Sequence, residues 1–218
     1  MVNRSINIDQ YSTRAAWDEK YRSGPTPWDT RISPPEVQAF WRTQRLDPAD
    51  NLLALDFGCG TGTNAAYLAG LGIHTIGIEV SSIALQSARH RHLNLIRKDI
   101  LHFVQADVTR VPFAHAQANY ALDIGCMHGL PLDLRADYAR GVIANLAPGG
   151  YYQLYAFDRV PAATTDAKSD ATSDALDMRG LAPGELESLF TPWLTIVEAI
   201  AARPDRRPCH WYLLHKPR

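Results

Sequence analysis

Short apolar runs alternate with segments of helical character from residue 52 onward, and this alternation constrains the fold more than any other feature of the sequence. The apolar runs predict five strands, over residues 52–55, 73–79, 101–106, 120–124 and 151–157. Helices are expected after three of these strands, over residues 64–71, from Ser81-Ser82 onward, and over residues 133–146. Strands that alternate with helices form a parallel sheet with right-handed crossovers.

The C-terminal part of the chain departs from this alternation. A short helix is expected over residues 183–190, and two further strands, 194–201 and 209–215, are separated only by the turn 203–208. We therefore expect the sheet to end in an antiparallel pair. The predicted fold is α/β, a Rossmann-like three-layer sandwich with a seven-stranded, mostly parallel sheet and a C-terminal antiparallel hairpin. Residues 162–175 lack an apolar period, and we expect them to form a mobile surface loop.

An aromatic N-terminal segment precedes this core. Tyr11, Trp17 and Tyr21 recur at helical spacing before a break at residues 24–27, and a second helix is expected to start at Pro34-Pro35. A length of 218 residues suits one domain. We divide it into an N-terminal helical cap, residues 1–49, and a core, residues 50–218.

Composition and charge exclude several classes of protein. The net charge of −1 gives no overall attraction to nucleic acid or to an anionic membrane. The longest apolar runs fall far short of the ~20 residues of a membrane-spanning helix, and residues 1–9 have no hydrophobic signal-peptide core. Three cysteines without metal-ligand spacing fit a reduced, cytoplasmic chain. We expect no metal, no membrane or nucleic-acid partner, and a monomer or homodimer.

The most informative segment follows the first predicted strand. Asp56 ends that strand, and Gly58, Gly60 and Gly62 then lead into a helix. Glycines let the backbone approach a ligand closely, and the start of a helix presents N–H groups that lack an intrahelical partner. This arrangement predicts a ligand site at the strand end.

Acids at the ends of the next two strands extend this site. Glu79 ends the second strand, about 20 residues on, where an acid hydrogen-bonds both hydroxyls of a ribose. Asp107 ends the third strand, where it suits the amino group of an adenine, with Val108 packing on the ring. Open α/β sheets bind ligands at the carboxyl ends of their strands. A cofactor that contains adenosine is therefore expected there.

Two classes of cofactor fit such a crevice. The dinucleotide motif G-x-G-x-x-G/A places Thr63 at its last position here. The spacing G-x-G-x-G after an acid instead resembles motif I of the class I S-adenosylmethionine (SAM) methyltransferases, and the resemblance extends over about residues 50–216. It implies SAM as cofactor and S-adenosylhomocysteine (SAH) as product, because an acid beside the glycines suits the ammonium group of SAM and repels a pyrophosphate. The implied cofactor-binding residues in the core are Asp56, Gly58, Cys59, Gly60, Gly62, Asn64, Glu79, Val80, Asp107, Val108 and Asp123.

The N-terminal cap carries a second resemblance. The segments Trp17-Asp-Glu-Lys-Tyr21 and Gly24-Pro-Thr-Pro-Trp28-Asp29 resemble the cap of the thiopurine, thiol/halide and tellurite-resistance methyltransferases. The resemblance implies that Trp17, Tyr21 and Trp28 line the cofactor pocket. Aromatic faces attract a cation such as the SAM sulfonium and exclude water. The alternative is a helix whose aromatic stripe packs on the core.

The acceptor side is expected at the end of the fourth strand, where Asp123 and His128 lie. His128 is the candidate general base, since its pKa lies near working pH; the alternative is a histidine hydrogen-bonded in a turn at a helix entry. Asp123 is expected to orient the amino group of the cofactor. Ile124 stands where the thiopurine enzymes carry Arg, which leaves the acceptor open.

The sequence thus predicts a SAM-dependent methyltransferase that acts on a small molecule, with a thiol or another soft nucleophile as acceptor. Two alternatives stay open: a nucleotide-dependent oxidoreductase that uses the same crevice, and a catalytically silent SAM-binding protein.

Overall fold

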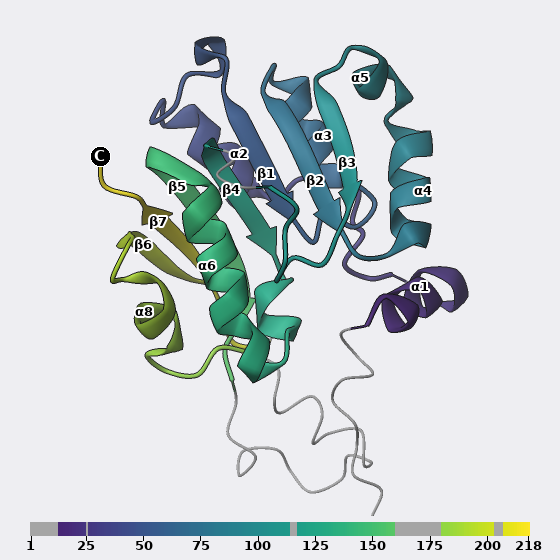
Figure 1. Cartoon of the computed structure of the whole chain (residues 1–218). Helices are drawn as coiled ribbons and strands as arrows, with labels where there is room; N and C mark the ends of the chain where they lie inside the picture. The colour runs from purple at the N-terminus through teal and green to yellow at the C-terminus, as the bar shows by residue number, and fades with distance from the viewer. Residues whose placement is uncertain (1–12, 25, 114–116, 160–179, 203–206) are drawn as a thin grey trace, which may run out of the picture.

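The computed structural model describes residues 13–24, 26–113, 117–159, 180–202 and 207–218, and its centre is one seven-stranded sheet. The strands run in the order β3-β2-β1-β4-β5-β7-β6 (Figure 1). Their bounds are β1 Leu53–Phe57, β2 His74–Glu79, β3 Leu101–Gln105, β4 Ala118–Ile124, β5 Leu146–Phe157, β6 Thr195–Ala202 and β7 Cys209–His215. Strands β1 to β5 pair in parallel, whereas β7 pairs antiparallel with both β5 and β6. The predicted fold class is confirmed.

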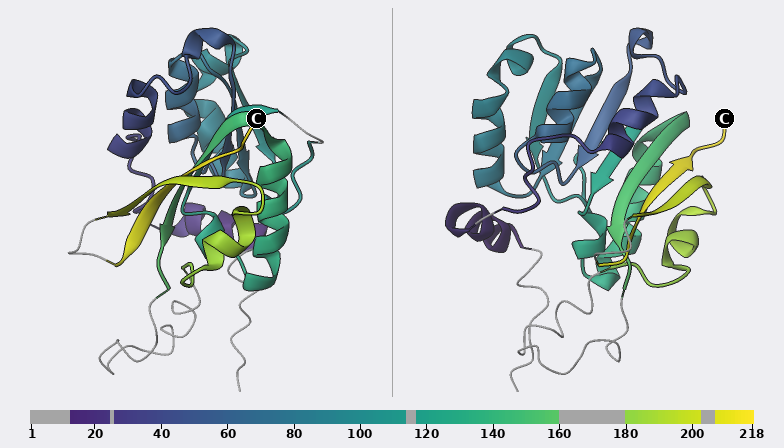
Figure 2. Two further views of the ribbon diagram at one scale, coloured as in Figure 1. Left: turned by 90° about the vertical axis from the view of Figure 1, so that its left-hand side faces the viewer. Right: turned by 180° about the vertical axis from the view of Figure 1, so that it is seen from behind.

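Helices cover both faces of the sheet, as the turned views of Figure 2 show. Their bounds are α1 Arg14–Ser23, α2 Pro35–Arg42, α3 Thr63–Gly70, α4 Ser82–Arg91, α5 Leu93–Arg97, α6 Arg135–Asn145 and α8 Glu185–Phe190, with 3-10 turns η2 Pro48–Asp50, η3 Met127–Gly129 and η4 Leu132–Leu134. On one face, Tyr138 and Val142 of α6 join Phe190 of α8 in a buried cluster. On the other, Phe40 of α2 and Leu68 of α3 form a second cluster. None of the helices in the described ranges is long and apolar enough to cross a membrane.

Several element boundaries differ from the prediction by one or more residues, and three of the differences bear on the site or the sheet. Strand β1 continues to Phe57, so Asp56 lies inside the strand and not at its end. The basic helix after Ser81 breaks at His92, where φ is −116°, and resumes as α5. Strand β5 begins at Leu146, ahead of two glycines, because Leu146 already pairs with Ala118 before the register shifts. The mobile loop expected over residues 162–175 lies outside the described residues.

Helix α1 and the segment after it lie at the carboxyl edge of the parallel strands. In Figure 1 the arrowheads of β1, β2 and β4 point toward this edge, and α1 lies there next to the beginning of α4. The second helix begins at Pro35 as predicted and buries Val37, Phe40 and Trp41. The fold therefore brings the cap to the edge where the predicted cofactor residues end their strands. The division into cap and core stays a prediction.

Candidate functional site

The glycine-rich loop between β1 and α3 has a backbone that other residues do not readily adopt. Gly58, Gly60 and Gly62 have φ of +70°, +55° and +80°. A Cβ on Gly58 would stand 2.7 Å from Cβ of Cys126, and one on Gly60 would stand 2.6 Å from the Tyr21 hydroxyl. The loop is fixed to β2, because the N–H groups of Gly58 and Cys59 both donate to the carbonyl of Ile78. It is a rigid cradle that requires glycine both for its φ angles and for close contact.

Glu79 lies directly beside this cradle. Its Oε2 accepts a hydrogen bond from Gly60 N–H at 3.0 Å, and its Oε1 accepts one from Ser81 N–H at 2.8 Å. The residue is 6% exposed. Burial raises the pKa of Glu79, although the backbone N–H donors oppose that rise. Each carboxylate oxygen retains a second lone pair, so the side chain can still accept hydrogen bonds from two hydroxyl groups.

Asp56 is buried beneath the same loop, with 2% of its surface exposed. The N–H of Ala65, in the first turn of α3, donates to its carboxylate. Its Oδ2 is buried and has no hydrogen-bond partner within the described residues. Burial, with smaller contributions from the charges of Asp123 and Glu79, raises the pKa of Asp56 to about 7. An unpartnered buried carboxylate oxygen is costly unless a cation or a proton meets it.

Unlike Asp56, Asp123 has hydrogen-bond partners at both carboxylate oxygens. Its side chain is fully buried and accepts from Tyr138 Oη at 2.6 Å and from the N–H groups of Cys126 and Met127 at 2.7 and 2.9 Å. Burial raises the pKa of Asp123 to about 6. These hydrogen bonds fix the Asp123 carboxylate and stabilise the turn that follows β4, on the side where the acceptor is expected.

The remaining predicted cofactor residues of the core are spread along the crevice. Asp107 lies two residues beyond β3, and its Oδ1 accepts from the N–H and hydroxyl of Thr109 at 2.9 and 2.8 Å. Val108 is 6% exposed and joins the core cluster beneath α6. The Val80 carbonyl accepts from Gln105, and the Asn64 side chain accepts from Ser33 Oγ at 2.8 Å. Asn64 thereby ties α3 to the segment before α2.

The three cap aromatics form one cluster. The ring centroids of Trp17 and Tyr21 are 6.4 Å apart, and Trp28 lies 5.9 Å from each. Trp28 Nε1 donates to Tyr21 Oη at 3.2 Å. The same hydroxyl lies against Gly60, and burial together with the charge of Glu79 raises the pKa of Tyr21. The structure therefore brings Tyr21 to the glycine-rich loop, with Trp17 and the half-exposed Trp28 packed against it.

His128 lies in the 3-10 turn η3 and is 7% exposed. Its Nδ1 accepts from Phe157 N–H at 3.2 Å, and its ring lies 4.6 Å from that of Phe157. A neutral imidazole has one donor and one acceptor nitrogen, so a ring that accepts at Nδ1 carries its proton on Nε2. This matches the hydrogen-bonded turn that the sequence left as the alternative.

Two carboxylates of the cap had not been singled out in the sequence. Asp18 accepts from Ser81 Oγ at 2.7 Å, and Asp29 accepts from Thr61 Oγ1 at 2.8 Å and pairs with Arg91 at 2.9 Å. Each directly follows a cap tryptophan in the sequence. That adjacency was the only available signal, because their partners lie 32 to 63 residues away along the chain.

No group of three His, Cys, Asp or Glu side chains suited to a metal ion occurs in the part of the chain that the structure describes. Cys59, Cys126 and Cys209 are free thiols.

Comparisons with known proteins show which families the chain resembles. Residues 54–150 match the family model for a methyltransferase domain. The 2-heptyl-1-hydroxyquinolin-4(1H)-one methyltransferase of Mycobacteroides abscessus is 28% identical over 163 residues, which are 73% of this chain and 67% of that protein. A probable thiol methyltransferase of Arabidopsis thaliana is 26% identical over 96 residues, 44% of this chain and 41% of its own.

Solved structures agree in fold. A Burkholderia thailandensis 1,6-didemethyltoxoflavin-N1-methyltransferase, solved with that compound and SAH bound, has a TM-score of 0.68 and 19% identity, covering 94% of this chain and 87% of the other. The chain spans between about half and two thirds of the length of the first curated relatives it matches.

Residues 54–150 thus match a methyltransferase domain, and the fold is that of SAM-dependent methyltransferases of class I. SAM is the cofactor that this class implies, and the residues present fit it: a glycine cradle that a Cβ would fill, an acid placed for ribose hydroxyls, and a buried carboxylate oxygen without a partner. The domain match also favours methyl transfer over the oxidoreductase alternative.

Proposed function

We propose that this protein transfers the methyl group of SAM to a small-molecule nucleophile, with a thiolate or another soft atom as the preferred acceptor. The observation that carries the proposal is the convergence of Asp56, Glu79 and the glycine cradle at one edge of the sheet, beneath the aromatic cap. The resemblance of the cap to that of the thiopurine, thiol/halide and tellurite-resistance enzymes supports the choice of a soft acceptor.

Each residue has a defined part in holding SAM. Glu79 accepts the ribose hydroxyls, Asp107 and Val108 hold the adenine, and Asp56 meets the ammonium group of the methionine moiety. The backbone of the loop around Cys59 approaches the cofactor, while Val80 and Asn64 border it. Asp123 acts through the turn that it holds. SAM supplies an electrophilic methyl group when bound.

The cap is proposed to place electron-rich aromatic rings beside the cofactor. Tyr21 lies at the loop and the rings of Trp17 and Trp28 pack against it, while Lys20 Nζ lies 4.0 Å from the centroid of the Trp17 ring. The faces of Tyr21 and Trp28 are therefore the ones proposed to stabilise a sulfonium cation. Most of the acceleration is expected from holding acceptor and methyl carbon in line, which contributes up to about 7–11 kcal/mol in favourable cases.

The geometry of His128 supports an acceptor that arrives already ionised. To take up a proton at Nδ1, the ring must first give up its hydrogen bond from Phe157. A thiolate needs no such base. We assign His128 a part in orienting the acceptor from Nε2, with proton uptake required only for acceptors that carry a proton at neutral pH.

A hydroxyl group on a flat heteroaromatic compound is the second candidate acceptor. The rings of Tyr155 and Phe157, 5.7 Å apart at the end of β5, together with His128, form an aromatic wall near the acceptor side. The M. abscessus relative is named for a hydroxyquinolone substrate. Flat rings stack well on such a wall.

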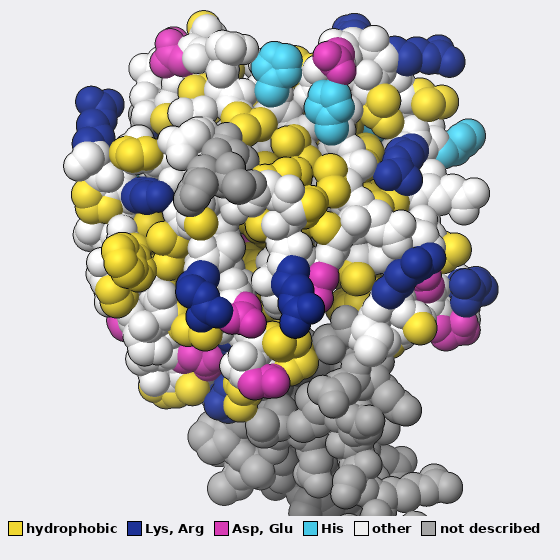
Figure 3. All heavy atoms as spheres, viewed as in Figure 1, with side chains coloured by type: hydrophobic (Ala, Val, Ile, Leu, Met, Phe, Trp, Pro, Cys, Tyr) yellow, Lys and Arg dark blue, Asp and Glu magenta, His cyan; other side chains and the backbone are white. Residues whose placement is uncertain are grey.

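The protein is proposed to act in the cytoplasm as a monomer or homodimer, without a nucleic-acid partner. On the face seen in Figure 3, basic and acidic side chains are interspersed. With a net charge of −1, this surface offers no extended basic footprint for a phosphate backbone.

Two measurements test the proposal. Isothermal titration with SAM should show binding by the wild type and none by Gly60→Val, because the new side chain would meet the Tyr21 hydroxyl. A screen with methyl-labelled SAM against thiols, halides, tellurite, amines and hydroxyquinolones should label a thiol or another soft acceptor. Equal SAM affinity in both proteins would refute the site, and labelling of hydroxyquinolones alone would select the second candidate.

A further inference from the structure

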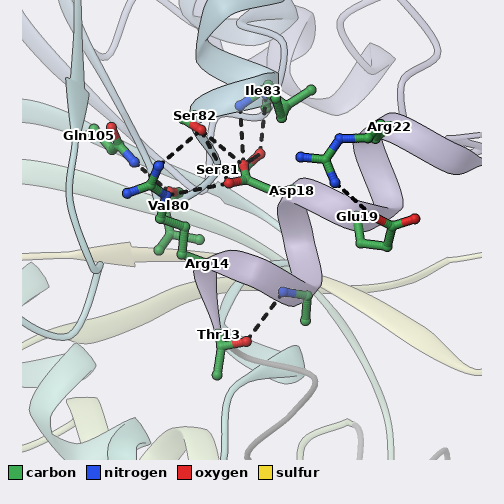
Figure 4. A network of polar contacts seen from close by, with 12 residues as sticks. Thr13, Arg14, Asp18, Glu19, Arg22, Val80, Ser81, Ser82, Ile83 and Gln105 are labelled. Atoms are coloured by element: carbon green, nitrogen blue, oxygen red, sulfur yellow. Dashed lines mark hydrogen bonds and ion pairs between the residues drawn. The ribbon is translucent and has the colours of Figure 1, made fainter.

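Helix α1 is attached to the core through Asp18, as Figure 4 shows. Asp18 Oδ1 accepts from Ser81 Oγ at 2.7 Å and from Ile83 N–H at 3.2 Å, while its Oδ2 accepts from Ser82 Oγ at 3.1 Å. All three donors belong to the N-terminal end of α4, where N–H groups are unpaired and the helix dipole favours an anion. Asp18 is a cap of α4 that comes from another helix.

Helix α4 does not depend on this contact for its own cap. The Ser81 hydroxyl already accepts from Ala84 N–H at 3.2 Å, the standard arrangement for a serine at this position. The contacts of Asp18 therefore contribute mainly to the docking of α1. Burial alone raises the pKa of Asp18, but the hydrogen bonds from Ser81, Ile83 and Ser82 outweigh it and hold the pKa at about 2.

The docking contact is continuous with the cofactor cradle. Ser81, which donates to Asp18 through its hydroxyl, donates through its N–H to Glu79 Oε1 at 2.8 Å. The other Glu79 oxygen accepts from Gly60 at 3.0 Å. Ser81 thus donates a hydrogen bond both to Asp18 of the cap and to Glu79, the residue proposed to bind the ribose.

A second cap carboxylate, that of Asp29, attaches the cap to the loop just before α3. Asp29 Oδ1 accepts from Thr61 Oγ1 at 2.8 Å, just ahead of the first residue of α3, and its Oδ2 pairs with Arg91 at 2.9 Å. Hydrogen bonds from Arg91 and Thr61 outweigh burial and lower the pKa of Asp29. Asp18 and Asp29 therefore attach the cap at two points, the N-terminal end of α4 and Thr61 within the glycine-rich loop, and each follows a tryptophan by one residue.

We propose that Asp18 and Asp29 are positioning residues that hold Trp17, Tyr21 and Trp28 over the glycine-rich loop, so that the cap favours the sulfonium of SAM over the neutral thioether of SAH. The inference rests on the proposed function, since it assumes that SAM occupies the cradle. The inference goes beyond the proposed function in one respect. It assigns the geometry of the aromatic cluster, and therefore the preference for SAM over SAH, to two carboxylates that contact neither ligand.

The test compares Asp18→Ala with Glu19→Ala. Both substitutions place a strong helix former in α1, but Glu19 pairs only with the exposed Arg22. Isothermal titration of the wild type and both variants with SAM and with SAH gives three SAM-to-SAH affinity ratios to compare. We expect Asp18→Ala to bind SAM about tenfold more weakly, and the SAM-to-SAH affinity ratio to fall about fivefold, because cation–π contacts act on the sulfonium alone. Glu19→Ala should match the wild type, and Asp29→Ala should match Asp18→Ala.

Hydrogen exchange separates positioning from a structural role. In Asp18→Ala, amide exchange should rise across residues 14–23 and at Ile83, which loses its acceptor, and stay unchanged across residues 84–91, because α4 keeps its Ser81 cap. Wild-type affinities and ratio in Asp18→Ala would overturn the inference alone. An equal loss of SAM and SAH binding with faster exchange across residues 84–91 would also overturn it, since that pattern marks a purely structural cap. A wild type that binds neither ligand would overturn the proposed function and this inference with it.

Discussion

At the scale of single residues, three buried carboxyl groups of the site differ in their hydrogen-bond partners. Glu79 and Asp123 accept hydrogen bonds from backbone N–H groups at both oxygens. Asp56 accepts only from Ala65 and leaves Oδ2 without a described partner. The same functional group, a carboxyl, thus has different partners at each position, and the carboxylate of Asp56 is the one suited to bind a cation.

The first prediction concerns the pH dependence of SAM binding. With its pKa raised to about 7, Asp56 is neutral in mildly acidic solution and gains its charge as the pH rises through that value. SAM affinity should therefore rise from about pH 5.5 to about pH 7.5 in the wild type and change much less in Asp56→Asn. The charges of Asp123 and Glu79 act on Asp56, and since the pKa of Asp123 is raised to about 6, its titration is the pH dependence expected to remain in Asp56→Asn.

Titration calorimetry at several pH values measures this slope. 5′-Methylthioadenosine, which lacks the ammonium group, serves as the matched ligand and should show little pH dependence in either protein. A slope for SAM that survives unchanged in Asp56→Asn would remove Asp56 from the ammonium site.

At the scale of elements, the acceptor-side turn is held by one buried arginine. Arg135, at the start of α6, is 1% exposed and donates to the carbonyls of His128, Leu130 and Gly180 at 2.9, 3.1 and 2.9 Å. It also pairs with Glu185 of α8 at 2.7 Å. A single side chain therefore joins η3, α6 and α8, and fixes the turn that carries His128.

The second prediction follows from that contact. Arg135→Met should destabilise the protein by about 3 kcal/mol, because it removes one buried donor from Glu185 and from three carbonyls. Arg159 still donates to Glu185 and to the Gly180 carbonyl, and Gly180 N–H still donates to the His128 carbonyl. Urea unfolding measures the loss, and Arg140→Met is the matched control on the same helix, where an exposed pair with Asp137 predicts a change below about 0.5 kcal/mol. Equal stability of the two variants would show that Arg135 does not hold the turn.

At the scale of the whole molecule, the sequence predicted the architecture because each strand carries its own apolar run. The alternation with helices predicted the parallel pairing and the short turn after Ala202 predicted the hairpin, whereas the strand order came only with the structure. The early start of β5 was missed because Gly149 and Gly150 break the apolar pattern, while the pairing of Leu146 with Ala118 is a tertiary event.

The candidate site was predictable to the same extent. Residues in or next to the glycine-rich loop have local signals, as Gly60 and Glu79 show. Asp18 and Asp29 carry none of their own, because their roles arise only when the cap folds back on α3 and α4. Likewise, no local pattern shows that Phe157 donates to His128.

The central claim is that Glu79, the carboxylate between the glycine loop and the cap, binds the ribose of SAM. Titration of SAM into wild type and Glu79→Gln tests it most directly, with circular dichroism to show that both are folded. The glutamine keeps the shape but loses the charge and half of the acceptor capacity. We predict one SAM per chain in the wild type and affinity lower by at least about tenfold in Glu79→Gln. Equal affinity in the two proteins would contradict the account.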